Sequence, residues 1–115
     1  MDIIQTFRRL SQKNIFGDMF SVQHHQVELI KKLYAKNGLV ITGGGAMPEQ
    51  YEVFKDGQRV AYYRLRHGDF TVDCPGPSGE EIFAAEPNGD GAFDGDERLN
   101  YLTKAMRLVL KHIGQ

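Results

Sequence analysis

The sequence predicts an α+β fold in which an antiparallel β meander of four to five strands packs against helices, in the order α-α-β(4-5)-α. Segments with helical spacing lie towards both ends of the chain, and short β-branched and aromatic segments fill its middle. The links between those middle segments are short, which favours antiparallel neighbours over strands joined by a crossover helix. Helices grouped before and after the strands are typical of the α+β class.

Length and composition fit one domain over residues 1–115. The chain is close to the commonest domain size. Hydrophobic residues make up 41% and charged residues 25%, far from the apolar-poor, highly charged composition of disordered chains. We therefore expect one buried core and folding without a partner.

Three segments have the 3.6-residue spacing of amphipathic helices. They are residues 2–13, residues 19–36 and the C-terminal part of the chain. Asn37 and the glycine after it mark the end of the second helix. Both tolerate the left-handed conformation that closes a last turn. Asp94 with Glu97 fits a capping box for the third helix. The predicted buried positions are Val27, Ile30, Leu33 and Tyr34 in the second helix, and Leu99, Leu102, Met106, Val109 and Ile113 in the third.

The faces of the sheet decide the register of the first predicted hairpin, whose strands flank Asp56-Gly57. A two-residue turn there would send Val53 to the polar side of the sheet. A three-residue turn with a glycine bulge keeps Val53 on the apolar side, opposite Arg59, and sets Tyr51 opposite Ala61. We therefore expect the three-residue turn.

The second hairpin needs only a two-residue turn, at residues 67–68. That turn pairs Leu65 with Phe70 and Tyr63 with Val72. The resulting face is apolar and is expected to cover the core; its members are Tyr51, Val53, Ala61, Tyr63, Leu65, Phe70, Val72 and Cys74. The remaining strands are residues 39–42 before the hairpins and residues 81–85 after them.

Aromatic and charged side chains share the opposite face of the predicted sheet. Strand alternation places there Glu52, Phe54, Val60, Tyr62, Arg64, Arg66, Asp69, Thr71 and Asp73. Arg66 is then opposite Asp69, and Arg64 opposite Thr71. Aromatic and arginine side chains are enriched in binding hot spots. We therefore expect a ligand or partner to bind at Phe54, Tyr62, Arg64 and Arg66, with the arginines recognising an anion.

Two motifs that suggest ligand chemistry lack the required geometry. The glycine run at residues 43–45 follows a strand, but a phosphate-binding P-loop continues with Lys and Ser or Thr, whereas Ala46 comes next. His24 and His25 are adjacent, so on a helix their side chains diverge by about 100° and do not grip one ion. We expect a connecting loop at the first motif and no metal at the second.

The acidic segment 88–97 resembles a calcium loop in composition alone, since a register that starts at Asn88 puts Ala92 where an oxygen ligand is required. Helix capping accounts for its carboxylates. Cys74 is predicted on the buried face and His67 in a turn, too far apart to act as nucleophile and base. The sequence therefore names no catalytic residue, no cofactor and no metal site.

Charge and cysteine content indicate the setting of the protein. The formal net charge is −1 with a pI near 6.4, which disfavours nucleic-acid binding. The single cysteine, Cys74, forms no internal disulfide, as is usual in a reducing compartment. The sequence shows no signal-peptide core and no stretch of about 18 apolar residues. We expect a cytoplasmic protein that does not enter membranes.

The leading functional hypothesis is a small binding or interaction module that uses the Tyr- and Arg-bearing sheet face. Its partner is expected to be another protein, a second copy of the chain or a small anionic ligand. The alternative is a small hydrolase or ligand-binding protein with a site near His67 or the loop from Asp90 to Asp96. The absence of a catalytic constellation in the sequence favours the interaction module over an enzyme.

Overall fold

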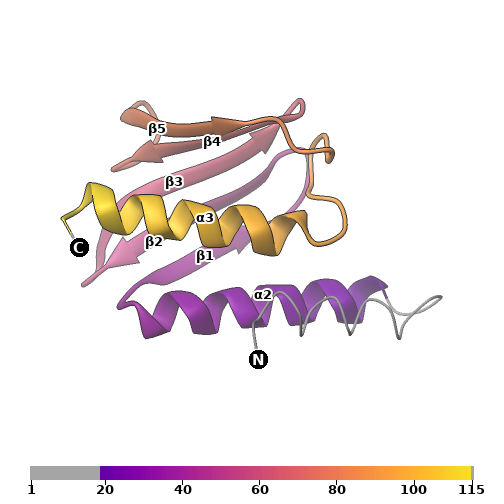
Figure 1. Cartoon of the computed structure of the whole chain (residues 1–115), viewed down its shortest axis with the longest axis horizontal. Helices are drawn as coiled ribbons and strands as arrows, with labels where there is room; N and C mark the ends of the chain where they lie inside the picture. The colour runs from indigo at the N-terminus through magenta and orange to yellow at the C-terminus, as the bar shows by residue number, and fades with distance from the viewer. Residues whose placement is uncertain (1–18, 115) are drawn as a thin grey trace.

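A computed structural model describes residues 19–114. The order of elements is α2 (Met19–Lys36), β1 (Val40–Gly44), β2 (Glu49–Lys55), β3 (Gln58–Arg66), β4 (Asp69–Cys74), β5 (Glu80–Ala85) and α3 (Glu97–His112) (Figure 1). The α+β class and the antiparallel sheet are confirmed. The order α-β5-α does not match the predicted α-α-β(4-5)-α; the extra helix was predicted for residues 2–13, which lie outside the described residues.

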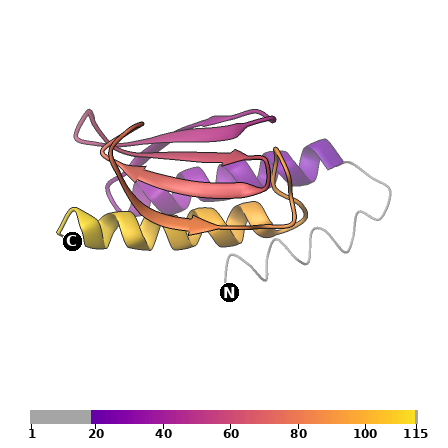
Figure 2. The same cartoon turned by 90° about the horizontal axis from the view of Figure 1, so that it is seen from above.

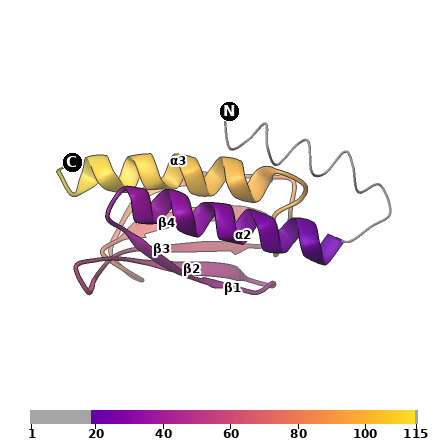
Figure 3. The ribbon, with the colours of Figure 1, turned by 90° about the horizontal axis from the view of Figure 1, so that it is seen from below.

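The five strands form one meander in the order β1-β2-β3-β4-β5, and every neighbouring pair is antiparallel. Helices α2 and α3 lie side by side on one face of this sheet (Figures 2 and 3). We call this covered side the inner face and the other side the outer face. None of the helices among the described residues is long and apolar enough to cross a membrane.

The core fills the space between the inner face and the two helices. All eight sheet residues predicted for the apolar face are buried. From α2, Ile30 and Tyr34 are buried as predicted, while Val27 and Leu33 are half-buried. The buried apolar residues of α3 are Leu99, Leu102, Ala105, Met106 and Val109. Ile113, predicted to be buried, is half-buried just after the helix ends.

A tyrosine pair links both helices to the middle of the sheet. The Tyr34 hydroxyl donates to the carbonyl of Leu102 at 2.6 Å and lies 2.8 Å from the Tyr63 hydroxyl. Since a hydroxyl has one proton, Tyr63 is the donor to Tyr34. Burial raises the pKa of Tyr34 well above its ordinary value, so this hydroxyl stays protonated and keeps donating.

The predicted turn of the first hairpin is wrong. Lys55 pairs with Gln58, so the turn contains two residues, both with positive φ as in a type I′ turn. The extra residue is Val60, a bulge within β3 that restores the faces: Val53 lies opposite Ala61, not Arg59, and Tyr51 lies opposite Tyr63, not Ala61. The apolar side of β2 was nevertheless predicted correctly. One extra residue shifts the alternation of side chains between the two faces by one position, whether it lies in the turn or in the strand.

The second hairpin is confirmed residue for residue. Leu65 pairs with Phe70 and Tyr63 with Val72 around the two-residue turn. Arg66 is therefore opposite Asp69 on the outer face.

Two glycines at the end of β1 have backbones that side chains rarely adopt. Gly43 has φ +132° and Gly44 has φ +135°. A Cβ atom on Gly43 would lie 2.2 Å from the carbonyl oxygen of Gln50 on β2, whereas one on Gly44 would meet nothing within 4 Å. The pairing of β1 with β2 at this point therefore requires glycine at position 43.

Comparing Gly43→Ala with Gly44→Ala separates steric conflict from backbone strain. Both substitutions should lower the free energy of unfolding by about 1–3 kcal/mol through strain at positive φ. Gly43→Ala should lower it by a further ~1–3 kcal/mol because of the overlap with Gln50. Urea denaturation followed by circular dichroism measures both. Equal losses would show that β1 and β2 are far enough apart at this point to accept a Cβ atom on residue 43.

Candidate functional site

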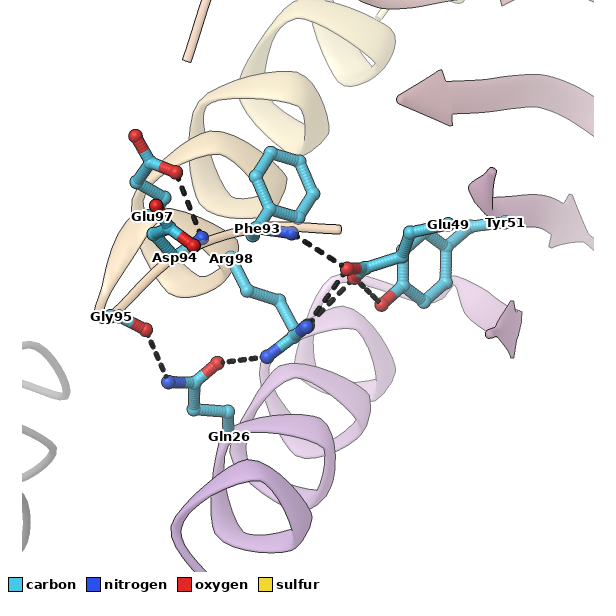
Figure 4. A network of polar contacts seen from close by, with 8 residues as sticks. All are labelled: Gln26, Glu49, Tyr51, Phe93, Asp94, Gly95, Glu97 and Arg98. Carbon is cyan, nitrogen blue, oxygen red and sulfur yellow. Dashed lines mark hydrogen bonds and ion pairs between the residues drawn. The ribbon is translucent and has the colours of Figure 1, made fainter. Parts of the chain in front are cut away.

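A buried ion pair lies where β2, α3 and α2 meet (Figure 4). Glu49, the first residue of β2, is 1% exposed, and Arg98, in the first turn of α3, is 7% exposed. The Arg98 Nε donates to Oε2 of Glu49 at 2.7 Å, and Nη2 donates to Oε1 at 2.8 Å. This two-pronged contact is the strongest arrangement that arginine and carboxylate form.

Two further donors complete the shell of Glu49. The Tyr51 hydroxyl donates to Oε2, and the backbone N–H of Phe93 donates to Oε1 at 3.0 Å. Burial, with the charge of Glu49 next, raises the pKa of Tyr51, which keeps this hydroxyl protonated. Four donors fill the roughly four acceptor positions of a carboxylate. Glu49 is thus satisfied by the protein itself and has no position left for a ligand.

Gln26 connects the ion pair to α2. Its Oε1 accepts a hydrogen bond from Nη1 of Arg98 at 2.6 Å, and its Nε2 donates to the carbonyl of Gly95 at 2.7 Å. Burial by itself would lower the pKa of Arg98, but its hydrogen bonds to Glu49 and the charge of Glu49 raise it above the ordinary value. Arg98 therefore stays charged, and the network joins α2, β2, α3 and the loop before α3.

A hollow of about 300 Å³ borders this network. It is lined by His24, Val27, Gly44, Gly45, Glu49, Tyr51 and Arg98. The opposite charges of Glu49 and Arg98 cancel, and Glu49 is fully bonded, so we assign the network a positioning role.

The loop between β5 and α3 is the part that the network positions. Glu97 accepts backbone N–H groups from Asn88 at 2.6 Å, Gly89 at 3.0 Å and Asp94 at 2.9 Å. Its contact with Asp94 is one half of the predicted capping box. The other half is wrong, since the helix begins at Glu97 with Asp96 at the N-cap position.

Backbone hydrogen bonds fasten this loop to two turns of the sheet. The carbonyl of Gly91 accepts the N–H groups of Met47 and Glu49, both at 2.8 Å. The carbonyl of Asp90 accepts the N–H of Gly68 at 2.8 Å. The loop is therefore held against the β1–β2 connection and the β3–β4 turn together.

This attachment creates a second hollow, of about 250 Å³, lined by Met47, Arg66, His67, Asp90 and Gly91. We call it the Arg66 hollow. It brings together one residue of the predicted binding face, Arg66, with His67 and Asp90 from the predicted alternative site. Asp94 and Asp96 do not line it.

The other predicted binding residues lie on the outer face. The Tyr62 hydroxyl donates to Oε1 of Gln50 at 2.7 Å. Arg64 is exposed and lies between Gln50 on β2 and Thr71 on β4, both uncharged. Phe54 is half-buried and pairs with Val40, which is 60% exposed. Arg66 is the residue that belongs to both the outer face and the Arg66 hollow.

Four residues of these two sites were not predicted from the sequence: Glu49, Arg98, Gln26 and Met47. The sequence does contain a signal for Glu49. This residue lies two residues before Tyr51 and four before Val53, so strand alternation places all three on the inner face. No local signal marks its partner, since Arg98 is 49 positions away. Residues 19–114 contain no group of three or more His, Cys, Asp or Glu side chains placed to bind a metal ion.

Comparison with protein-family models, curated proteins and solved structures finds no match to this chain. We therefore infer the function from the geometry of the site.

Removing one member of the buried ion pair should destabilise the fold strongly. In Arg98→Met the Glu49 carboxylate stays buried without its cation, so we expect a loss of about 3–5 kcal/mol in the free energy of unfolding. Arg107→Met, at an exposed position of the same helix, is the matched control and should change it by less than about 0.5 kcal/mol. Thermal and urea unfolding of both variants provide the measurement; similar stabilities would contradict the central role of the pair.

Cys74 should react slowly with alkylating agents in the native protein. Burial, with smaller effects of Asp73 and Glu80, raises the pKa of this thiol to about 11. The thiolate fraction at pH 8 is then about 100-fold lower than for a thiol of pKa 9, and the 3% exposed side chain is also shielded from the reagent. Labelling with iodoacetamide should be at least about 100-fold slower in buffer than in concentrated urea. Comparable rates would mean that Cys74 is accessible in the native state.

Proposed function

We propose that this chain is a small protein-binding module that uses its outer face. The observation that carries the proposal is the one-sided packing of the sheet: α2 and α3 both lie on the inner face, and no described element covers the other side (Figure 2). The partner is another protein or a second copy of this chain. Antiparallel sheets do occur with one solvated face, so the proposal also needs side chains suited to binding.

Unpaired arginines supply part of that suitability. Within residues 24–114, ion pairs closer than 4 Å join Arg59 to Glu52 at the rim and Arg98 to Glu49 in the core. Neither Arg64 nor Arg66 forms one with a described residue. Arg64 has only uncharged cross-strand neighbours, so its guanidinium is available to a carboxylate of a partner.

Tyr62 offers an aromatic surface that is already held in place. Its hydrogen bond to Gln50 restrains the ring next to Arg64, which reduces the entropy lost on binding. Phe54 and the exposed Val40 add apolar area at one end of the same face. Tyrosine and arginine with nearby apolar area form the composition typical of a binding hot spot.

The area of the face indicates a modest affinity. Five strands spaced about 4.8 Å apart and about six residues long cover roughly 500 Å². Two such surfaces in contact would bury about 1,000 Å², the lower limit for a specific interface. We therefore propose a reversible interaction and not a permanent complex.

We also propose a cytoplasmic setting and a protein partner in preference to nucleic acid. A single cysteine buried as a free thiol suits a reducing compartment. A net charge of −1 gives no general attraction for a polyanion.

A second candidate function is the binding of a small molecule in the Arg66 hollow. It is favoured by the convergence of Arg66, His67 and Asp90 from two separate segments. Hydrolysis would need an acid/base partner within hydrogen-bond reach of His67, and the described residues provide none. Ligand binding is therefore what we propose for this hollow.

The double variant Tyr62→Ala/Arg64→Ala tests the outer face. Loss of two hot-spot side chains should weaken partner binding by at least about 30-fold. Two measurements apply: sedimentation velocity over a range of concentrations for self-association, and affinity capture from extract of the source cells, with mass spectrometry, for other proteins. Lys31→Ala, which removes one exposed positive charge on α2, is the control and should behave as the unmodified chain.

The proposal is wrong if the double variant keeps both the oligomeric state and the set of captured proteins of the unmodified chain. Circular dichroism should confirm that the variant is folded, which we expect because Arg64 is exposed and Tyr62 is only half-buried on the outer face.

A further inference from the structure

We propose that the Arg66 hollow binds a small zwitterion with an apolar side chain, that is, a free α-amino acid. This inference rests on the second candidate function above and names its ligand class. It follows from three properties of the hollow: two separated charges of opposite sign, an exposed thioether, and walls held rigidly by backbone hydrogen bonds.

The charges of the hollow select a dipolar ligand. Arg66 presents a guanidinium that matches a carboxylate in two-pronged geometry. Asp90 presents a carboxylate that accepts hydrogen bonds from an ammonium group. Arg66 and Asp90 line the same hollow, yet they form no ion pair with each other or with any other described residue. A simple anion would be repelled by Asp90 and a simple cation by Arg66, whereas a zwitterion satisfies both.

Asp69 is the nearest competitor for Arg66, since the two are cross-strand partners. It makes no ion pair with Arg66 among the described contacts, and it does not line the hollow. The imidazole of His67 adds a further polar group beside Arg66.

Met47 provides the apolar wall. Its side chain is 83% exposed, which makes it one of two large hydrophobic residues exposed in the described chain. A thioether adapts its shape to different apolar groups. Covering Met47 with the side chain of a ligand would remove this surface from water, which is favourable.

The walls of the hollow are held in place before any ligand binds. Met47 and His67 both have φ +53°, a conformation that non-glycine residues seldom adopt; for His67 it belongs to the two-residue turn between β3 and β4. The N–H groups of Met47 and Gly68 are bonded to the 90–91 segment of the loop. A Cβ on Gly91 would lie 2.7 Å from Cγ of Met47, so only glycine lets the two walls approach this closely.

The size of the hollow also fits an amino acid. Its volume of about 250 Å³ is below the 300–1,000 Å³ typical of drug-sized ligands. A molecule of about ten non-hydrogen atoms is the size that this space accepts.

The test uses L-leucine as the probe and two blocked derivatives. N-acetyl-L-leucine lacks the ammonium charge and L-leucinamide lacks the carboxylate. In ¹H–¹⁵N correlation spectra of the labelled chain, L-leucine should shift the signals of His67, Gly68 and Gly91 in a saturable way. Each blocked derivative should bind at least about tenfold more weakly, because it leaves one charge of the hollow without a partner.

Three variants assign the contacts. Arg66→Ala and Asp90→Asn should each weaken leucine binding by about ten- to 100-fold. Arg64→Ala removes the neighbouring outward arginine of the same strand, which does not line the hollow, and should leave leucine affinity unchanged. All three positions are exposed, and each spectrum also reports whether the variant is folded.

Two results would overturn the inference: no saturable shift with L-leucine up to about 10 mM, or equal affinity for leucine and both blocked derivatives. Its failure is distinguishable from failure of the protein-binding proposal. Arg64 serves only the outer face, so loss of partner capture in the Tyr62→Ala/Arg64→Ala variant together with no leucine binding would leave the outer face as the functional surface.

Discussion

The ion pair between Glu49 and Arg98 is the interaction on which the arrangement of the molecule depends. Moving one charged side chain out of water costs several kcal/mol, and a buried pair offsets this cost only when its geometry is good and its remaining acceptor positions are filled. Here the pair is two-pronged, and Tyr51 and the Phe93 amide fill the rest. Because these donors come from β2, α3 and the loop before α3, all three must adopt one relative position for the pair to be tolerated.

Fixing that loop has consequences beyond the core. The same segment that gives the Phe93 amide to Glu49 also gives the Gly91 and Asp90 carbonyls to the β1–β2 connection and to the β3–β4 turn. Residues at these attachments line the Arg66 hollow. A buried, fully satisfied polar network therefore places a solvent-facing pocket without taking part in it, which separates the residues that stabilise the fold from those available to a ligand.

Strand β3 brings the two proposed surfaces together. Its outward residues run along the middle of the sheet, with Tyr62 and Arg64 on the open face and Arg66 at the end, where the loop meets the sheet. Side chains two positions apart on a strand share a face, so Arg64 and Arg66 are neighbours with different surroundings. Arg64 has uncharged neighbours on both adjacent strands, whereas Arg66 faces a pocket that also contains a carboxylate. The fold thus places Arg64 and Arg66, two arginines on the same face of one strand, in different chemical environments.

Local patterns in the sequence determined the α+β class, helix α2, the inner face of the sheet and the register of the β3–β4 hairpin. Strand alternation and short turns act over a few residues, so they can be read along the chain. The turn of the first hairpin was predicted wrongly because an extra residue in the turn or in β3 gives the same apolar face. Only tertiary structure decided that Glu49 meets Arg98 and that Asp90 lies beside Arg66, because these contacts join segments that no local periodicity relates and that come together only when the loop packs against the sheet.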